Sequence, residues 1–155
     1  MFGNSGSGKT TRARALADEH DLVHLDLDSI VWEPDRVAVQ RPLADVLASL
    51  RDFLGAHDRW VIEGCYGELV EAAAPECTRL VFLNPGVEVC QANNRRRPWE
   101  PEKYASPEEQ DRYLDALQEW VADYYHRDGS WSYAAHRAIF DAYPGDKIEV
   151  GASEG

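Results

Sequence analysis

The sequence predicts an α/β domain in which helices cover both faces of a mostly parallel sheet. Short apolar runs alternate with amphipathic stretches along the chain, as expected for parallel strands joined by right-handed helical crossovers. A glycine-rich segment, residues 3–10, also stands directly before a run of good helix formers, as in phosphate-binding loops. The chain has 155 residues, which suits a single domain spanning residues 1–155.

Residues 3–10 read GNSGSGKT and satisfy the pattern G-x-x-x-x-G-K-[ST]. The glycines let the loop turn its backbone N–H groups toward phosphates, which larger side chains would obstruct. Lys9 adds a mobile cation, the Thr10 hydroxyl is expected to ligate Mg²⁺, and the positive end of the helix dipole faces the same phosphates. The predicted phosphate-binding residues are Gly3, Asn4, Ser5, Gly6, Ser7, Gly8, Lys9, Thr10 and Thr11.

The strand before this loop is almost missing from the sequence. Only Met1 and Phe2 precede Gly3, whereas a phosphate-binding loop normally follows a buried strand of about 5 residues. We expect the first strand to be truncated, with its true start upstream. The alternative is that a very short strand is tolerated at the centre of the sheet.

Two carboxylates follow the second apolar run. Residues 22–25 predict a strand, and Asp26 and Asp28 come at its carboxyl end, the edge where open parallel sheets bind ligands. One of them could hold Mg²⁺ through water while the other accepts a proton from an attacking hydroxyl. A turn or helix cap is the alternative, because Asp is also favoured there.

The middle of the chain supplies a helix and two more strands. Leucine and valine at helical spacing after Pro42 predict an amphipathic helix over residues 42–54. Residues 60–62 and 79–83 predict strands. Glu63 stands where such a fold places an acidic group near Mg²⁺, although its part in that site is open, and Gly64 would let the backbone pass close to the substrate.

An arginine cluster predicts a lid over about residues 95–106. A helix from about residue 87 leads into Arg95-Arg96-Arg97-Pro98, and guanidinium groups over transferring phosphates would stabilise the developing charge. A solvated basic turn is the alternative. An acceptor-binding segment is expected over about residues 30–57, where Arg36 or Arg41 would meet an anionic group unless each is an ordinary surface arginine.

The last third of the chain predicts two helices and a final strand. Ser106-Pro107-Glu108-Glu109 is a capping box with proline at the first helical position, so a long helix begins there. Its apolar stripe comprises Tyr113, Leu114, Leu117, Trp120, Val121 and Tyr124. A short helix over about residues 131–140 and a strand over residues 147–150 complete the expected order.

The composition argues against some classes of binding partner. The net charge is −12, concentrated in residues 100–155, which argues against binding of duplex nucleic acid through its phosphates. Three cysteines without metal-ligand spacing indicate reduced, partly buried thiols. No apolar run approaches the roughly 20 residues that span a bilayer, and no signal peptide is evident, so we expect a cytoplasmic protein without a membrane partner.

Four stretches of the chain resemble the P-loop kinases of the adenylate kinase and shikimate kinase group, most closely the small bacterial topology-modulation proteins. They are GNSGSGKTT at residues 3–11, HLDLDSIVW at 24–32, WVIEGCY at 60–66 and LVFLNPGVEVC at 80–90. The resemblance covers about two thirds of the chain, and only the first stretch is highly specific. Glu63 departs from the family pattern, because an aspartate is expected before that glycine.

The resemblance implies a three-layer P-loop NTP hydrolase fold with a five-stranded sheet of order 2-3-1-4-5, ATP as phosphate donor, Mg²⁺ and a mobile lid. It puts Asp28 at the acceptor hydroxyl, Asp26 near the metal and Gly64 in the acceptor wall. It puts Arg95 and Arg97 over the phosphates. Shikimate is not carried over as the substrate, because the segment over residues 99–140 is longer than a shikimate kinase needs.

The first hypothesis is therefore an ATP-dependent kinase with a small hydroxyl- or phosphate-bearing acceptor. Its catalytic residues would be Lys9, Asp28, Arg95 and Arg97, its acceptor-binding residues Asp28, Arg36 and Gly64, and its metal-binding residues Thr10 and Asp26. A nucleotide-binding regulatory module is the alternative, motivated by the acidic C-terminal third. A kinase for nucleic-acid ends is a third hypothesis, disfavoured by the net charge of −12.

Overall fold

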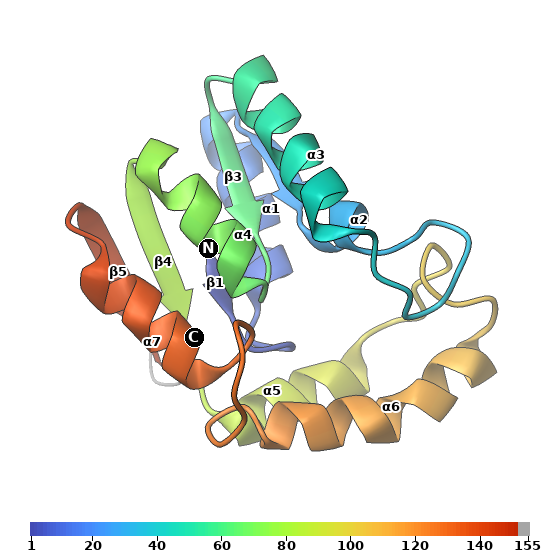
Figure 1. Cartoon of the computed structure of the whole chain (residues 1–155). Helices are drawn as coiled ribbons and strands as arrows, with labels where there is room; N and C mark the ends of the chain where they lie inside the picture. The colour runs from blue at the N-terminus through green and yellow to red at the C-terminus, as the bar shows by residue number, and fades with distance from the viewer. Residues whose placement is uncertain (152–155) are drawn as a thin grey trace.

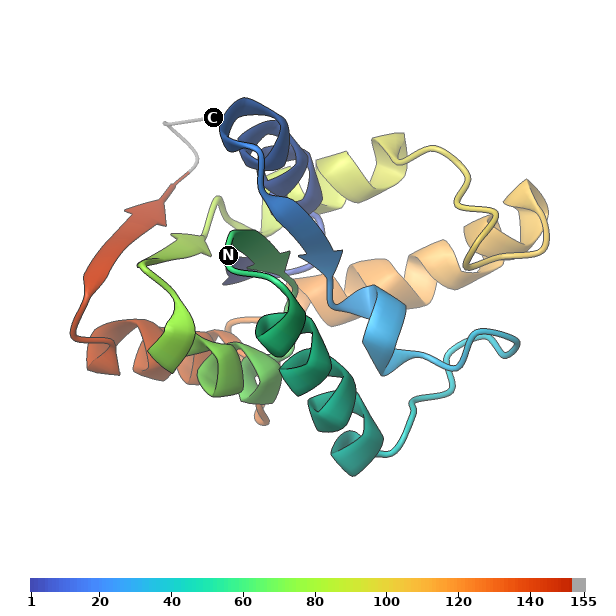
Figure 2. The same cartoon turned by 90° about the horizontal axis from the view of Figure 1, so that it is seen from above.

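The computed structural model describes residues 1–151 and confirms an α/β architecture of parallel strands and helices (Figure 1). Seen from above, α1 and α5 lie on one side of the strands, and α3, α4 and α7 lie on the other (Figure 2). The elements in chain order are β1 (Phe2–Gly3), α1 (Lys9–His20), β2 (Val23–Asp26), α2 (Asp28–Val31), α3 (Leu43–Ala56), β3 (Trp60–Glu63), α4 (Gly67–Ala73), the 3₁₀ turn η1 (Ala74–Glu76), β4 (Arg79–Leu83), α5 (Val87–Arg96), α6 (Pro107–Ala122), α7 (Tyr133–Ala142) and β5 (Asp146–Val150).

The strands form two parallel sheets, one of order β1-β4-β5 and one of order β2-β3. A single parallel bridge, between Phe2 and Gly64, connects them. The expected continuous five-stranded sheet is therefore not confirmed. The reason lies in β1, whose two residues are too few to build a full ladder with neighbours on both sides.

The register of the strands brings polar side chains to one edge. Asp26 and Glu63, the last residues of β2 and β3, are paired partners, and Gly3 at the end of β1 is paired with Leu83 of β4. Because all these strands are parallel, their carboxyl ends meet at the same edge, which faces α5 and α6 in Figure 1. The loop from β1 to α1 starts at this edge.

Aromatic and aliphatic side chains hold the layers together. Phe2 and Phe82 stack with ring centroids 4.9 Å apart, and His136 of α7 meets Phe2 edge-on at 5.3 Å. Helix α3 buries Val46 and Leu50, which confirms the helix expected over residues 42–54. Apolar burial of this kind is the main source of fold stability.

Helix α6 begins at the expected cap. Ser106 Oγ accepts a hydrogen bond from Glu109 N at 3.1 Å, and Glu109 Oε2 accepts one from Ala105 N at 2.6 Å. The predicted apolar stripe is buried only toward its end, because Val121 is buried whereas Tyr113 is 42% exposed. No helix within residues 1–151 is both long and apolar enough to span a membrane.

Candidate functional site

The loop between β1 and α1 has a backbone that only glycine adopts easily. Gly6 and Gly8 have φ of +81° and +94°, a region that disfavours residues with a Cβ. A Cβ at Gly6 would also collide with the carbonyl oxygen of Cys90 and lie 2.9 Å from Asn94 Nδ2, whereas a Cβ at Gly8 would meet nothing within 4 Å. Gly6 is therefore required by space as well as by conformation.

Side chains of α5 hold the same loop in place. Asn93 Nδ2 donates to Gly6 O at 2.8 Å, and Asn94 Nδ2 donates to Ser5 O at 3.5 Å. From within the loop, Asn4 Nδ2 donates to Val121 O at 3.1 Å and so reaches α6. Sequence reasoning missed both α5 asparagines, because a lone amide gives no signal until its partner's position is known.

Lys9 and Thr10 open α1 at this loop. Lys9 Nζ donates to Asn4 O at 2.7 Å and is buried, so the ammonium folds back over the loop. Thr10 Oγ1 donates to Glu63 Oε1 at 2.8 Å, and His24 Nε2 lies 3.3 Å from that same oxygen. Thr11, by contrast, is exposed. Glu63, which the sequence left open, is thus the direct partner of the Thr10 hydroxyl.

Asp26 lies at the end of β2 beside two other acids. Burial, together with the negative charges of Asp28 and Glu63, raises the pKa of Asp26 from 3.8 to about 6. Its Oδ1 accepts a hydrogen bond from Asp28 N at 2.9 Å. The strand ends therefore collect more negative charge than the surrounding residues neutralise.

Asp28, the first residue of α2, is held from two sides. Tyr66 donates its hydroxyl hydrogen to Asp28 Oδ1, and Lys103 Nζ donates to Asp28 Oδ2 at 2.8 Å. Burial raises the pKa of Asp28, but the Lys103 ammonium and these hydrogen bonds outweigh burial and leave the pKa below its ordinary value. Trp32 Nε1 donates to the Tyr66 oxygen at 2.8 Å.

The predicted arginines do not converge on this cluster. Arg97 pairs with Glu100 at 3.7 Å, within the segment expected to form the lid, and Arg95 and Arg36 are exposed. Arg41 donates to Ile30 O at 2.8 Å, so it fastens the α2–α3 connection. The basic residue that reaches the carboxylates is instead Lys103, which sequence reasoning missed because it lies outside the arginine cluster.

Gly64 follows β3 and is packed beneath α2. A Cβ there would lie 2.9 Å from Leu27 side-chain atoms and 3.2 Å from Tyr66 Cδ2. Close packing alone accounts for a glycine at this position. Its predicted contact with an acceptor remains a prediction.

The lid loop, residues 97–106, connects α5 to α6. Figure 1 shows it at the same end of the molecule as the connection between α2 and α3, residues 32–42, and Figure 2 agrees. A small cavity of about 20 Å³ lies at the base of the lid loop, lined in part by Asn94, Arg97 and Glu100. The lid loop thus borders Asp28, which Lys103 contacts at 2.8 Å.

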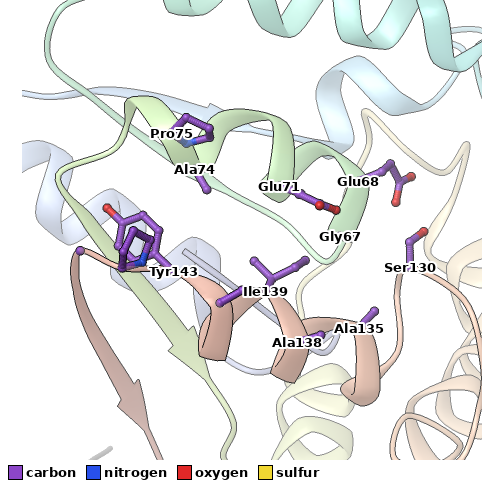
Figure 3. Close-up of a pocket in the computed structure, with 13 residues that line it drawn as sticks. Gly67, Glu68, Glu71, Ala74, Pro75, Ser130, Ala135, Ala138, Ile139 and Tyr143 are labelled. Carbon is purple, nitrogen blue, oxygen red and sulfur yellow. The ribbon is translucent and has the colours of Figure 1, made fainter.

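A cavity of about 840 Å³ lies away from this cluster, between α4 and α7 (Figure 3). Alanine, proline and Ile139 side chains dominate its lining, and Glu68 and Glu71 are its only charged residues. It lacks the converging polar groups that a phosphoryl-transfer site needs. We therefore place the candidate site at the phosphate-binding loop, where a loop backbone, a lysine and three carboxyl groups meet.

Comparison with known proteins identifies a similar fold. No protein-family model matches the chain, and no curated protein matches it significantly. An unliganded crystal structure of a sugar kinase from Janibacter sp. HTCC2649 is similar over 99% of this chain and 84% of that chain, with 19% identity and a TM-score of 0.54. The two chains share a fold. An uncharacterized protein from Eubacterium ventriosum ATCC 27560 is similar over 97% of this chain and 87% of that chain, with 17% identity and a TM-score of 0.47.

Proposed function

We propose that the protein is an ATP-dependent kinase that transfers the γ-phosphate of ATP to a small acceptor bearing a hydroxyl or phosphate group. The observation that carries this proposal is the hydrogen bond from Thr10 to Glu63, at the edge of the strands where Asp26 and Asp28 also lie. Phosphoryl transfer needs a phosphate-binding loop, an acidic metal site and a base close together. The sugar kinase that shares the fold supports the same class of reaction.

The loop would bind the phosphates of ATP. Its two left-handed glycines turn the backbone around the start of α1, where free N–H groups and the helix dipole favour anions. Lys9 would exchange the Asn4 carbonyl, 2.7 Å from its Nζ, for a phosphate oxygen. Arg95 and Arg97 would have to turn toward the phosphates to take the role expected of them.

The acidic residues fit a divalent cation. Asp26 has a pKa of about 6 because burial and two neighbouring carboxyl groups disfavour its charge, a situation that a cation would relieve. Residues 1–151 contain no group of three His, Cys, Asp or Glu side chains able to hold a metal by themselves. Mg²⁺ suits such a site, because it keeps several waters and takes phosphate oxygens as ligands. Thr10 and Asp26 would hold it, and it would neutralise the charge that develops during transfer.

Asp28 would accept the proton of the acceptor hydroxyl. It lies at the start of α2, two residues after Asp26, and Tyr66 fixes one of its oxygens. If the Phe2–Gly64 bridge joins the two sheets, the strands would have the order 2-3-1-4-5, and this order would place Asp28 beside the loop as in P-loop kinases. The acceptor would then lie between α2 and the lid loop.

The test uses γ-labelled ATP and Mg²⁺ with a panel of nucleoside monophosphates, sugars, hydroxy acids and short oligonucleotides. The wild-type protein should label one class of acceptor. Lys9→Ala should lose both ATP affinity and transfer, whereas Asp28→Asn should bind ATP normally and transfer at least about 100-fold more slowly. Lys147→Ala, which changes a lysine on β5, is the matched control and should behave as wild type.

Each result has one meaning. Normal transfer by Asp28→Asn would show that the base is another residue. Absence of ATP binding by the wild-type protein would refute the proposed kinase activity. Tight ATP binding without transfer to any acceptor, together with capture of one stoichiometric partner only in the ATP state, would establish the regulatory module instead.

A further inference from the structure

The lid loop is tied to α2 by a single side chain. Within residues 1–151, Lys103 makes the only ion pair or side-chain hydrogen bond between the lid loop and α2, to Asp28 Oδ2 at 2.8 Å. Other polar contacts of the lid loop stay local, such as Trp99 Nε1 to Tyr104 O at 3.0 Å and Glu100 N to Gln110 Oε1 at 2.8 Å. The contact that closes the lid loop is therefore made to the proposed base.

The two oxygens of Asp28 are held in different ways. The Tyr66 oxygen receives the Trp32 indole hydrogen, so the Tyr66 hydroxyl hydrogen is directed at Asp28 Oδ1. Tyr66 is 3% exposed and packs edge-on against Trp131 at 4.9 Å, which fixes this arrangement in the core. Oδ2 faces the lid loop, and its partner there is Lys103.

Lys103 has a second acidic partner. Its Nζ lies 3.1 Å from Glu100 Oε1, within the lid loop itself. A group that displaced the ammonium from Asp28 would therefore leave it paired with Glu100. Displacement therefore does not leave the Lys103 ammonium without a partner, and an unpaired buried charge would be far more costly.

We propose that Lys103 is a specificity-determining residue, which occupies Asp28 Oδ2 until an acceptor displaces it and so keeps water from taking the acceptor's place. This inference rests on the proposed kinase function. A bound acceptor contributes contacts along its whole surface, and these can offset the loss of the Lys103–Asp28 pair. A water molecule has no such contacts, so the pair persists against it.

The step that Lys103 suppresses is ATP hydrolysis. In that reaction a water oxygen forms a bond to the γ-phosphorus, and the water proton passes to Asp28 Oδ2. The bond from the γ-phosphorus to the bridging oxygen breaks, and its electron pair stays on ADP. With Lys103 donating to Oδ2, one lone pair of that oxygen is occupied and the oxygen is less basic, so it accepts the water proton less readily.

The test measures ADP formation from Mg²⁺ and ATP with no acceptor present, so it needs no knowledge of the substrate. Lys103→Met should raise this rate roughly three- to tenfold, the effect of losing one partly exposed ion pair on the barrier. Lys103→Arg keeps a cation at the same place and should stay near the wild-type rate. Lys147→Met removes the lysine of β5 and should leave the rate unchanged.

A double variant separates gating from a loosened structure. Lys103→Met combined with Asp28→Asn should return to the low wild-type rate, because the carboxylate that accepts the water proton is gone. An unchanged rate in Lys103→Met, or a raised rate that persists in the double variant, would overturn the inference while leaving the kinase proposal standing. Failure of the wild-type protein to bind ATP in a direct titration would overturn both.

Discussion

Asp26 lies where the ends of β2 and β3 bring carboxyl groups together. Its pKa is raised from 3.8 to about 6 by burial and by Asp28 and Glu63, so the folded protein disfavours the ionised form that the unfolded chain takes freely. At neutral pH this charge works against folding. Residues that serve binding or catalysis often lower stability in this way.

Replacing Asp26 with asparagine should therefore stabilise the fold while removing the proposed metal-dependent activity. We expect a gain of about 1–2 kcal/mol in the free energy of unfolding at pH 7, reduced from the full shift because the side chain is partly solvated. The folded wild-type protein takes up a proton as pH falls below about 6, so the gain should shrink toward pH 4. Chemical denaturation at both pH values measures it, with exposed Asp18→Asn as control. A loss of stability at pH 7 would contradict this account.

The sequence predicted which residues of the site lie near each other only for residues that belong to a recognisable motif. Lys9, Thr10, Asp26 and Asp28 belong to short segments with a recognisable order, and the structure places them at one edge of the strands. The contacts of Tyr66 and Lys103 with Asp28 could not be predicted from the sequence, because they span 38 and 75 positions of the chain. Nothing local marks an ion pair across such a distance.

At the scale of elements, α1 and its loop depend on α5. The loop passes so close to α5 that Gly6 has no room for a side chain. Gly8 also has a left-handed backbone, but a Cβ there would point into open space. The two glycines thus differ in packing and share a backbone conformation. They allow the two effects to be separated.

Gly6→Ala should lower the free energy of unfolding by at least about 3 kcal/mol, because the new methyl group collides with backbone at Cys90 as well as forcing a strained φ. Gly8→Ala should cost about 1–2 kcal/mol, the conformational penalty alone. Thermal or urea unfolding of both variants gives the comparison. Equal losses in the two variants would show that the Cys90 carbonyl yields easily.

The elements differ in how well the sequence predicts them. Strand β4 and helix α3 were expected nearly at their observed bounds and helix α6 at its observed start, because an apolar pattern or a capping box stands there beside a proline or a glycine. Helices α2 and α4 were missed. They have four and seven residues, too short for a helical period to stand out, and tertiary packing fixes them.

At the scale of the whole molecule, His136 joins α7 to the strand ends. It is fully buried, and Nε2 lies 2.8 Å from Cys65 O while Nδ1 lies 2.7 Å from the Tyr124 oxygen. The carbonyl accepts from Nε2, so the tyrosine hydroxyl donates to Nδ1 and the ring is neutral. Burial lowers the pKa of His136 from 6.5 to about 4, despite the opposing effect of the Cys65 carbonyl.

Acid should therefore destabilise the fold through His136. Above pH 6.5 the ring is neutral in both states, and as pH falls toward 4 only the unfolded chain takes up the proton. Relative to His136→Gln, the wild-type protein should lose about 3 kcal/mol between pH 7 and pH 4. Asp26 opposes this trend in both proteins, so the difference between them is the quantity to measure. Exposed His126→Gln should match wild type, and a pH-independent difference for His136→Gln would contradict the assignment.

The sequence separation between β1 and its ladder partners on β4 also bears on the order in which the chain folds. Phe2 and Gly3 have their ladder partners at Phe82 and Leu83, far along the chain, so the ladder of β1 is complete only once β4 is in place. Until then the strand before the glycine-rich loop is held by the Phe2–Gly64 bridge, without its ladder to β4. The pair β2-β3 closes over a shorter stretch of chain and can form earlier. The strand that leads into the phosphate-binding loop is thus paired late, and a loop able to bind nucleotide would form only after most of the domain has folded.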